Sequence, residues 1–431
     1  MEFNILKAEK FCDSVKDGTH DSPKKANKGY KLITSKHIRE YDLDLNNAYY
    51  ISEEDFNKIN QRSLVEKNDI LYSMIGTIGL IYRVKENPDY AIKNIGLFKL
   101  KDELKSKWLY YYLKTPKMKK YIESLLSGST QQYITLKNLR ELPIEVPVNI
   151  ENMKKIVKIL ENINKKIELN NKINNNLQEI INLIFKKWFI EFEFPILDGK
   201  CYKSSNGIMK NSELGEIPEN WKVIKLENII DFSNGYSIDS KKMLDKEEKN
   251  TYKVFKMGNI KPLGGINKDK TKSWLSKEYC TGLEKYISKK GDILMCMTDM
   301  KNSDTPLLGH TALIDKNNEF IINQRVGILR CKKELVNYPF VYTLTNLDFF
   351  VKDIRSRANS GVQVNLSTKG ICETPLIFPD KKTLDEFNNI TEPIYEKIFK
   401  NNDENETLSK LRDNLLPKLM NGEIDLENIE I

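Results

Sequence analysis

Two short polar turns in this sequence carry side chains that suit the reading of DNA bases. They are Ser127-Gly128-Ser129-Thr130-Gln131-Gln132-Tyr133 and Asn359-Ser360-Gly361-Val362-Gln363-Val364-Asn365. A glutamine amide can bind adenine with two hydrogen bonds, and serine and threonine hydroxyls can reach phosphates or base edges. A glycine-containing turn is also an ordinary helix end. Both interpretations stay open, and the candidate DNA-binding residues of the turns are Ser129, Thr130, Gln131, Gln132, Gln363 and Asn365.

Basic side chains elsewhere in the sequence could hold DNA phosphates. Arg355 and Arg357 lie just before the second turn, and Lys117 belongs to a lysine cluster before the first. Clusters of this kind can clamp phosphates, although a charged helix face in solvent is the usual alternative. Further candidates are Lys36, Arg39, Arg83 and Arg325.

Residues for catalysis or metal binding are few in this sequence. The six cysteines are scattered without a C-x-x-C pair, and the three histidines have no metal-ligand spacing. Neither a phosphate-binding ATP loop nor an N-P-P-[YF] motif for gripping a flipped adenine occurs, since Asn87-Pro88-Asp89-Tyr90 lacks the second proline. We therefore expect a binding protein with no catalytic residues, no metal and no cofactor of its own.

The charge distribution divides the chain into basic and acidic blocks. The formal net charge is +8. Residues 1–150 carry +5, residues 151–200 carry +2, residues 201–380 carry +6 and residues 381–431 carry −5. Two basic blocks of similar size favour a polyanionic partner, although a lysine-rich surface from an AT-rich genome is an alternative.

The chain also repeats itself. Residues 159–189 match the stretch 231 residues later without a gap, so that Glu161 corresponds to Glu392 and Asn170 to Asn401. The preceding segments correspond less cleanly, at offsets that drift from 218 to 232, as in the similar strings that begin at Lys67 and Lys290. Each half is therefore a variable globular block followed by an element of fixed length.

The two fixed elements show the heptad spacing of paired helices. The predicted helix-pairing seam comprises Ile163, Ile167, Asn170, Asn174 and Leu177 in the first copy and Ile394, Ile398, Asn401, Asn405 and Leu408 in the second. Asparagines at the same two steps could set the register of the helix pair, unless the asparagine-rich sequence breaks the helix. The 38 residues from Glu151 to Trp188 would span about 57 Å as a helix. Connectivity favours antiparallel pairing, which would hold the blocks apart.

The globular blocks read as α+β. We expect a hairpin over Asp69–Val84, its counterpart over Asp292–Ile314, and single helices over Lys107–Leu126 and Tyr338–Arg357. The predicted division is 1–150 for the first domain, 151–190 for the central helix, 191–380 for a linker and the second domain, and 381–431 for the C-terminal helix and tail. No apolar run is long enough to cross a membrane, and the polar N-terminus lacks a secretory pattern, so we expect a cytoplasmic protein.

Three strings in this layout resemble the specificity (S) subunits of type I restriction–modification systems. Lys166–Phe189 is similar to the central conserved region of that family, Gly215-Glu216-Ile217-Pro218-Glu219-Asn220-Trp221 to the start of its second recognition domain, and Leu411–Ile424 to its distal conserved region. The resemblance implies two target recognition domains in a pseudo-twofold arrangement, separated by two long antiparallel helices that form a coiled coil. It transfers no base-contacting residue, and the first half lacks a Gly-Glu-Ile-Pro lead-in.

The resemblance also implies the partners. These are double-stranded DNA read as a bipartite site, two DNA methyltransferase (M) subunits that carry S-adenosylmethionine, and restriction/translocase (R) subunits that use ATP and Mg where the system has them. The alternatives are a specificity subunit of a methyltransferase-only system, a self-sufficient DNA methyltransferase and a coiled-coil scaffold without DNA function. The missing motifs speak against the methyltransferase, and the basic blocks speak against the scaffold.

Overall fold

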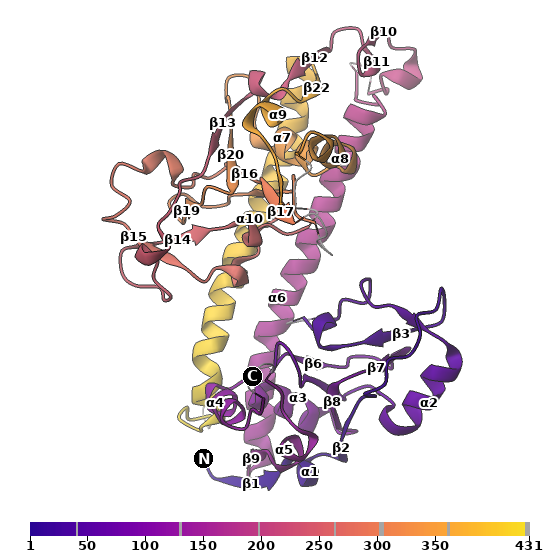
Figure 1. Ribbon diagram of the computed structural model, residues 1–431, viewed down its shortest axis with the longest axis vertical. Coiled ribbons are helices and arrows are strands. Elements are labelled where there is room, and N and C mark those ends of the chain that lie inside the picture. Colours follow the sequence, from indigo (N-terminus) through magenta and orange to yellow (C-terminus); the bar gives the residue numbers. More distant parts are fainter. Residues whose placement is uncertain are drawn as a thin grey trace. The chain divides into compact units, whose positions relative to one another are not determined.

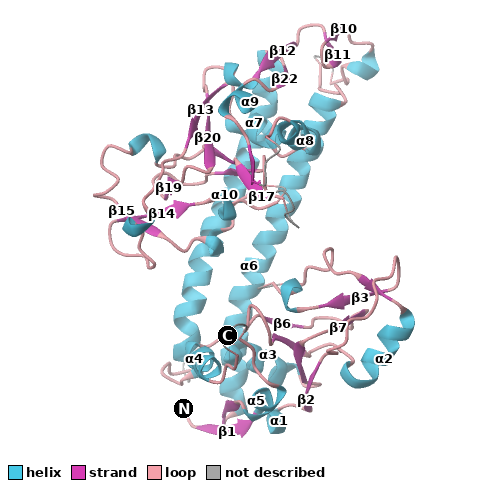
Figure 2. Cartoon of the chain, in the orientation of Figure 1, coloured by secondary structure: helices cyan, strands magenta, loops and turns pink. Residues whose placement is uncertain are grey.

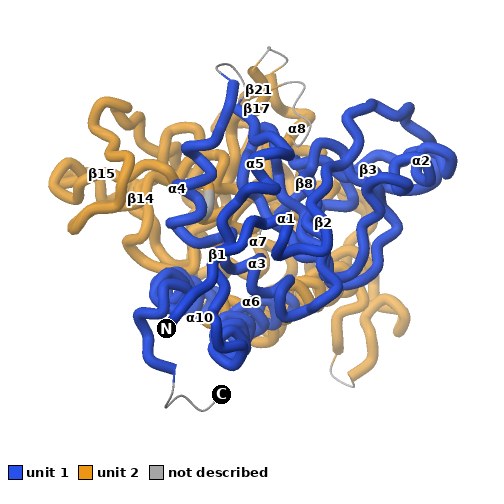
Figure 3. Tube along the Cα trace, turned by 90° about the horizontal axis from the view of Figure 1, so that it is seen from below, with its two compact units in different colours: residues 1–172, 402–431 blue, residues 173–401 orange. Residues whose placement is uncertain are grey.

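The computed structural model divides the chain into two compact units. It describes residues 1–39, 42–128, 132–196, 199–262, 264–300, 306–359 and 363–426. Unit 1 comprises Met1–Lys172 with Asn402–Ile431, and unit 2 comprises Ile173–Asn401 (Figure 3). The division falls inside the two long helices, so each unit contains one globular block with a portion of each helix.

Unit 1 contains nine strands and five short helices among its described residues (Figure 1). The strands are β1 (Phe3–Lys7), β2 (Ser14–Asp17), β3 (Tyr30–Ile33), β4 (Tyr50–Ile51), β5 (Ile70–Ser73), β6 (Ile81–Arg83), β7 (Tyr90–Ile92), β8 (Ile95–Lys99) and β9 (Pro143–Pro147). The helices are α1 (Ala8–Phe11), α2 (Glu53–Ser63), α3 (Glu103–Leu113), α4 (Pro116–Ser124) and α5 (Leu136–Glu141).

Unit 2 is built from a similar set of short elements. Its strands are β10 (Met209–Ser212), β11 (Gly215–Pro218), β12 (Lys222–Lys225), β13 (Ile230–Asn234), β14 (Thr251–Phe255), β15 (Trp274–Ser276), β16 (Ile293–Cys296), β17 (Thr298–Met300), β18 (Thr311–Leu313), β19 (Phe320–Ile322), β20 (Val326–Cys331), β21 (Gln363–Asn365) and β22 (Pro375–Phe378). Its short helices are α7 (Tyr338–Thr345), α8 (Asp348–Ser356) and α9 (Thr368–Cys372).

The sheets of the two units follow one plan (Figure 2). The four-stranded sheet β2-β8-β5-β6 of unit 1 corresponds to β13-β20-β16-β18 of unit 2. The three-stranded sheet β4-β3-β7 corresponds to β15-β14-β19, and the pair β1-β9 to β12-β22. The predicted hairpin of unit 1 is present, because β5 pairs antiparallel with β6. Its counterpart in unit 2 is an antiparallel pair of β16 and β18, with β17 between them along the chain. The α+β class and the two-domain repeat are thereby confirmed.

A buried aspartate explains why the strings at Lys67 and Lys290 look alike. Asn68 and Gly291 have φ angles of 74° and 87°, the left-handed conformation that asparagine and glycine tolerate best. The next residue closes the turn: Asp69 accepts the Glu66 amide at 2.7 Å and Asp292 accepts the Lys289 amide at 2.9 Å. Each carboxylate also pairs with a cation from the neighbouring strand, Lys99 in unit 1 and Arg330 in unit 2.

The two fixed elements form long helices, α6 (Ile150–Phe185) and α10 (Lys381–Met420). Helix α6 runs through its asparagine-rich stretch without a break and ends in a π-helical turn at Lys186–Ile190. Pro393 is accommodated inside α10. None of the helices among the described residues combines the length and the hydrophobicity that crossing a bilayer requires.

Portions of α6 and α10 pair antiparallel inside each unit. In unit 1, Asn164 and Asn170 of α6 contact Arg412 and Asn405 of α10, respectively. In unit 2, Asn174 contacts Asn401 and Gln178 contacts Tyr395. Residue numbers rise along one helix as they fall along the other, which confirms the predicted orientation.

The prediction of one helix over Lys107–Leu126 and one over Tyr338–Arg357 is wrong, because each is split in two. In unit 1, Thr115 adopts an extended backbone and caps α4, whose first residue is Pro116. Proline cannot donate the amide hydrogen that a continuous helix needs, whereas it fits a first helical position. In unit 2 the break comes at Leu347, which is extended immediately before α8.

Candidate nucleic-acid interface

In unit 2, the second glutamine turn lies against the end of β16. Strand β21 pairs with β17, so that Gln363 lies opposite Met300 and Asn365 opposite Thr298. The Leu366 amide donates to the Met297 carbonyl at 2.9 Å, and the Met297 amide donates to the Arg325 carbonyl at 3.2 Å. The structure therefore brings Arg325, Gln363 and Asn365 together at one end of the four-stranded sheet.

These three side chains differ in what they can offer a ligand. The side-chain oxygen of Asn365 accepts a hydrogen bond from the Thr298 hydroxyl at 2.8 Å, which ties Asn365 to β17. Gln363 and Arg325 are exposed, and neither side chain makes a hydrogen bond or ion pair to another described residue. Gln363 and Arg325 thus remain candidates for DNA contact, whereas the geometry of Asn365 suits a residue that positions the turn.

The two arginines at the C-terminal end of α8, Arg355 within it and Arg357 directly after it, already have protein partners. The Arg355 guanidinium donates to the carbonyls of Leu308 and Pro306, at 2.8 and 2.9 Å. Arg357 pairs with Asp353 one helical turn earlier, at 2.8 Å. Arg355 therefore anchors the segment that leads into β18. Arg357 is exposed at the helix end, where its charge is partly neutralised.

The first glutamine turn in unit 1 repeats this arrangement as far as it is described. Ser129, Thr130 and Gln131 lie outside the described residues. Gln132 is exposed, and the next residue, Tyr133, bridges Ile75 and Ser127. The Ile134 amide donates to the Met74 carbonyl at 3.0 Å, the counterpart of the Leu366–Met297 bond. Each turn thus approaches the four-stranded sheet of its own unit, and it does so at the equivalent end.

The structure does not bring the four basic candidates of unit 1 together at that turn. Arg83 lies opposite Ile70 at the far end of β5, where it bonds Asn68 at 3.2 Å. Lys117 is the second residue of α4, whose other end leads to the turn, and it pairs with Glu145 of β9. Arg39 pairs with Asp44 at 2.8 Å. Lys36 is exposed on the short turn after β3.

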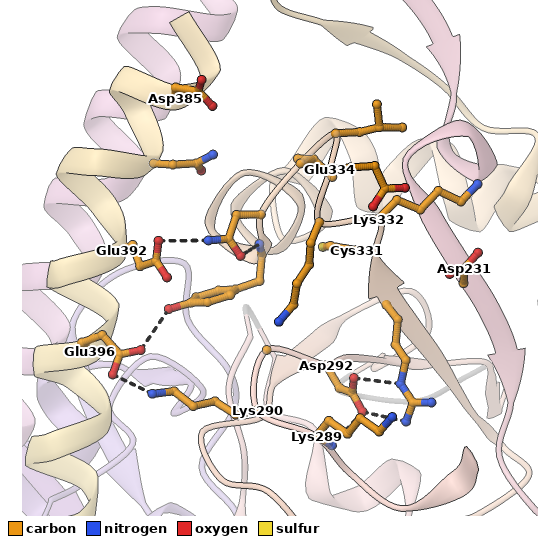
Figure 4. A pocket seen from close by; sticks show the side chains of 18 of the residues that line it. Asp231, Lys289, Lys290, Asp292, Cys331, Lys332, Glu334, Asp385, Glu392 and Glu396 are labelled. Atoms are coloured by element: carbon orange, nitrogen blue, oxygen red, sulfur yellow. Dashed lines mark hydrogen bonds and ion pairs between the residues drawn. The ribbon is translucent and has the colours of Figure 1, made fainter. Parts of the chain in front are cut away.

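A polar cleft of about 1140 Å³ lies in unit 2 between the β16 turn and α10 (Figure 4). Glu396 of α10 accepts hydrogen bonds from Lys290 at 2.7 Å and from the Tyr338 hydroxyl at 3.3 Å. Glu392 accepts one from Asn337 at 2.9 Å. Burial and the Glu396 carboxylate raise the pKa of Tyr338, so its hydroxyl stays protonated and donates. These contacts attach the globular block of unit 2 to α10.

The cysteines Cys12 and Cys296 are buried. Burial raises the pKa of both Cys12 and Cys296 to about 12, which keeps these thiols protonated and weakly nucleophilic. Among the described residues, no three histidine, cysteine or carboxylate side chains gather in a way that could hold a metal ion.

The predicted helix seam contains one asparagine pair in each unit. In unit 1, buried Asn170 donates to Asn405 at 3.0 Å and to Glu404 at 2.8 Å. In unit 2, buried Asn401 donates to Asn174 at 2.8 Å. The two pairs are equivalent under the 231-residue repeat. Of the remaining seam positions, Ile163 and Ile167 are buried, and those that are half-buried are Leu177, Ile394, Ile398 and Leu408.

Sequence reasoning missed a second buried stripe beside this seam. Asn164, Tyr395 and Phe399 lie one residue beyond seam positions, and all three are buried. Asn164 donates to the Tyr111 hydroxyl of α3 at 2.9 Å, and Tyr395 bonds Thr343 of α7 at 3.0 Å. The stripe joins each helix to its own globular block. A search for an apolar face wider than a strict coiled-coil seam would have found it.

Comparison with known proteins assigns this architecture to a family. The family model for the type I restriction modification DNA specificity domain matches the chain twice, over residues 4–179 and 218–409. The two matches span both globular blocks and cover most of the chain. The protein therefore belongs to this family and is a DNA sequence-specificity subunit of the type I restriction–modification class, with two recognition domains.

Individual relatives agree along nearly their whole lengths. The chain is 26% identical over 418 residues to the type I restriction enzyme MjaIX specificity subunit of Methanocaldococcus jannaschii, covering 92% of this chain and 87% of that protein. It is 24% identical to the type I restriction enzyme HindI specificity subunit of Haemophilus influenzae, covering 84% and 88%. The crystal structure of a type I restriction–modification S subunit from M. genitalium shares the fold, with a TM-score of 0.51 at 18% identity, covering 97% of this chain and 96% of that one.

Proposed function

We propose that each recognition domain reads one half of a bipartite DNA site and that α6 and α10 set the number of base pairs between the halves. The observation that carries this proposal is the repeat. Each unit has its own polar turn at the equivalent end of its four-stranded sheet, and its own asparagine pair between the long helices. Two similar readers on helices of fixed length suit two half-sites at a fixed separation.

The chemistry resides, on this proposal, in partner subunits. Two DNA methyltransferase (M) subunits dock on the helices and use S-adenosylmethionine, and restriction/translocase (R) subunits use ATP and Mg where the system includes them. This chain supplies recognition, and the complex acts on foreign DNA in the cytoplasm. The family supports this division of labour, because its members are specificity subunits.

Methylome sequencing tests the proposal directly. In a host that carries the gene, we expect methylated adenines in one bipartite motif, and deletion of the gene should abolish that methylation alone. The purified chain with its methyltransferase should reproduce the motif on unmethylated DNA. Motif methylation without restriction would indicate a methyltransferase-only system. Unchanged methylation after deletion would refute the proposal.

The role of the helices has a separate test. Seven residues inserted at equivalent positions of α6 and α10 add about 10 Å of helix, because each residue adds about 1.5 Å. Since base pairs are about 3.4 Å apart, the spacer should grow by about three base pairs while both half-sites stay the same. An unchanged spacer in a folded, active variant would rule out the helices as its determinant.

A further inference from the structure

Unit 1 has a lysine-rich loop that is absent from the predicted DNA-binding residues. Residues 19–31 contain four lysines (Lys24, Lys25, Lys28 and Lys31) and one acid, Asp21, for a formal net charge of +3. Lys24, Lys25 and Lys28 are exposed, and none of them forms an ion pair with another described residue. We call Lys24, Lys25, Lys28 and Lys31 the lysine patch.

The backbone of this loop is held firmly on the edge of the three-stranded sheet beside α2 (Figure 1). The Ala26 amide donates to the Tyr50 carbonyl at 2.8 Å, which extends the sheet beyond β4. At Gly29, whose φ is 134°, an added Cβ would lie 2.2 Å from the Ile51 carbonyl oxygen, so only glycine permits this approach. Tyr30 stacks on Phe56 of α2, with ring centroids 3.8 Å apart.

Aromatic rings and a carbonyl, rather than carboxylates, position the cations of the patch. The Lys31 ammonium lies 3.8 Å from the centre of the Tyr50 ring and donates to the Ala48 carbonyl at 2.9 Å. The Lys25 ammonium lies 5.6 Å from the centre of the Tyr49 ring. Such contacts orient a cation without cancelling its formal charge. The first three residues of α2, Glu53–Asp55, are acidic and are separated from β4 by the helix cap Ser52, whose hydroxyl donates to Asp55 at 2.9 Å.

The loop leaves the four-stranded sheet at the end where the first glutamine turn lies. The Gly18 amide donates to the Ile95 carbonyl at 2.9 Å, and Ile95 pairs with Ser73 at the end of β5. The next residue, Met74, accepts the hydrogen bond from Ile134 of the glutamine turn. The lysine patch and the candidate base-reading turn therefore both follow from the same end of the four-stranded sheet of unit 1.

Unit 2 lacks this uncompensated charge at the equivalent place. Its loop, residues 239–253, has five lysines but four acids interleaved with them, for a net charge of +1. Lys253 occupies the position of Lys31 and pairs with Glu319 at 3.0 Å. Lys268 pairs with the same carboxylate at 3.3 Å. Lys253 is thus neutralised by an ion pair, and the other lysines of the loop alternate along the chain with four acids that lower its formal charge.

We propose that the lysine patch of unit 1 binds the DNA phosphate backbone beside the half-site read by that unit, which makes unit 1 the more salt-sensitive half of the reader. The inference rests on the proposed function, because it takes double-stranded DNA as the partner. Phosphate contacts by lysine are independent of sequence and release counterions, so each contributes about 0.9 to the slope of log K against log salt. The patch adds anchoring, and the turns read bases.

The test compares two matched triple variants of the full chain with its methyltransferase. Lys24→Gln/Lys25→Gln/Lys28→Gln removes three exposed charges from the patch, and Lys241→Gln/Lys242→Gln/Lys246→Gln removes three exposed charges from the unit 2 loop. Binding of a fluorescent duplex that carries the methylome-derived site is measured by anisotropy across a KCl series. We expect the slope to fall by about 2 to 3 for the unit 1 variant and by less than about 1 for the control.

Each other outcome decides a different question. Equal slope changes in the two variants would overturn the inference, because the slope would then depend on the net charge of the protein and not on the patch. No change in the unit 1 variant would overturn it as well, because the patch would then make no phosphate contact. Loss of methyltransferase from the purified complex, with an unchanged slope, would assign the patch to a protein partner and also overturn it. If the unaltered complex shows no preference for the site, the proposed function itself fails. Equal melting temperatures establish that the variants are folded.

Discussion

The two units use different side chains at the equivalent contact between a long helix and its globular block. In unit 1, Asn164 of α6 donates to Tyr111 at 2.9 Å and accepts from Arg412 of α10 at 3.3 Å. In unit 2, the equivalent residues under the repeat are Tyr395, Tyr342 and Ile181. The two tyrosine rings pack with centroids 5.8 Å apart, and Ile181 is fully buried in the same core. The hydrogen-bonded triad of unit 1 is thus replaced in unit 2 by packed aromatic and aliphatic side chains, and the Tyr395 hydroxyl bonds Thr343 instead.

Other positions are alike in both units. The turn aspartates, Asp69 and Asp292, have the same backbone partner and a cation opposite, and the asparagine pairs recur at equivalent steps. A buried polar group cannot lose its partner without leaving an unsatisfied charge or hydrogen bond, whereas an apolar contact accepts several shapes. We call the contacts that both units share, namely the ion pairs of the turn aspartates and the asparagine pairs, the frame. The contacts that differ between the units can be exchanged without loss of the fold.

The largest effect should come from breaking the frame at the turn aspartates. Asp292→Asn leaves Arg330 without its carboxylate, whereas Asp69→Asn leaves Lys99 with Glu66, at 2.6 Å, as its remaining carboxylate partner, so the loss should be larger in unit 2. The carboxylates of Asp292 and Asp69 are only 5% and 2% exposed. Removing one partner of a buried ion pair costs about 3–5 kcal/mol. Urea unfolding, followed by hydrogen exchange of peptides from each unit, measures the loss and assigns it to the altered unit.

The two turns should also differ in how they tolerate exchange of the cation. Arg330 binds Asp292 through two nitrogens, each at 3.0 Å, whereas Lys99 contacts Asp69 through one, at 2.8 Å. Arg330→Lys should therefore destabilise unit 2 measurably, because lysine cannot reproduce the two-point contact. An Asp292→Asn variant as stable as the parent would show that the turn is not part of the frame.

An intermediate effect is expected from Arg412→Ile, which copies the unit 2 residue into unit 1. The change removes the donor to the side-chain oxygen of Asn164, a buried residue. An unsatisfied buried acceptor costs about 1–3 kcal/mol. The same unfolding and exchange measurements should show loosening of the 150–172 portion of α6. The double variant Asn164→Tyr/Arg412→Ile, which restores the unit 2 set, should recover part of the loss. No recovery would mean that the backbones of the two units differ at this contact.

The smallest effect concerns pH and again contrasts equivalent residues. In unit 1, His37 accepts the Thr34 amide at 2.9 Å, and in unit 2, Asn259 accepts the Lys256 amide at 2.8 Å. Burial lowers the pKa of His37 and of His310 below their usual 6.5. The folded chain therefore favours neutral imidazoles, whose stability contribution is complete above pH 6.5 and is lost as the pH falls through the lowered values. The melting temperature should drop between pH 7 and pH 5, and His37→Asn should reduce that drop. An equal drop in both proteins would exclude His37 as a source.

Much of the fold was predictable because its signals are local and periodic. Alternating and heptad patterns identify β5, β6, α6 and α10, and the unbroken offset of 231 identifies the two helices as copies. The split of residues 107–126 into α3 and α4 was missed because the burial of Tyr110–Tyr112, on several sides of α3, conceals the break that Pro116 introduces. When apolar residues lie on all sides of a helix, their spacing shows no periodic pattern, and the end of the helix cannot be located from a change in that pattern.

The candidate interface was predictable only in part. Its glutamine turns could be found from composition and repetition, since polar turns with glycine are local features. The partners of Arg355 and Lys117 could not, because the carbonyls and the carboxylate that they contact come from distant parts of the chain, whereas Arg357 pairs with Asp353 one helical turn earlier. The lysine patch is hard to recognise for a related reason: lysine-rich stretches are common in this composition, and the rings of Tyr49 and Tyr50 that position Lys25 and Lys31 are brought to them only by the fold.

The sequence by itself determined that the protein consists of two similar halves with helices of fixed length and matched asparagines. These properties depend on order and spacing along the chain, which the residues record directly. Only the tertiary structure decided which cations stay unpaired, as at Lys24, and which are neutralised, as at Lys253. It likewise decided that Asn164 faces its globular block and Asn170 the other helix. The pairing of charges and the direction in which a side chain points depend on distances across the fold, and those distances are set only when the strands and helices have packed.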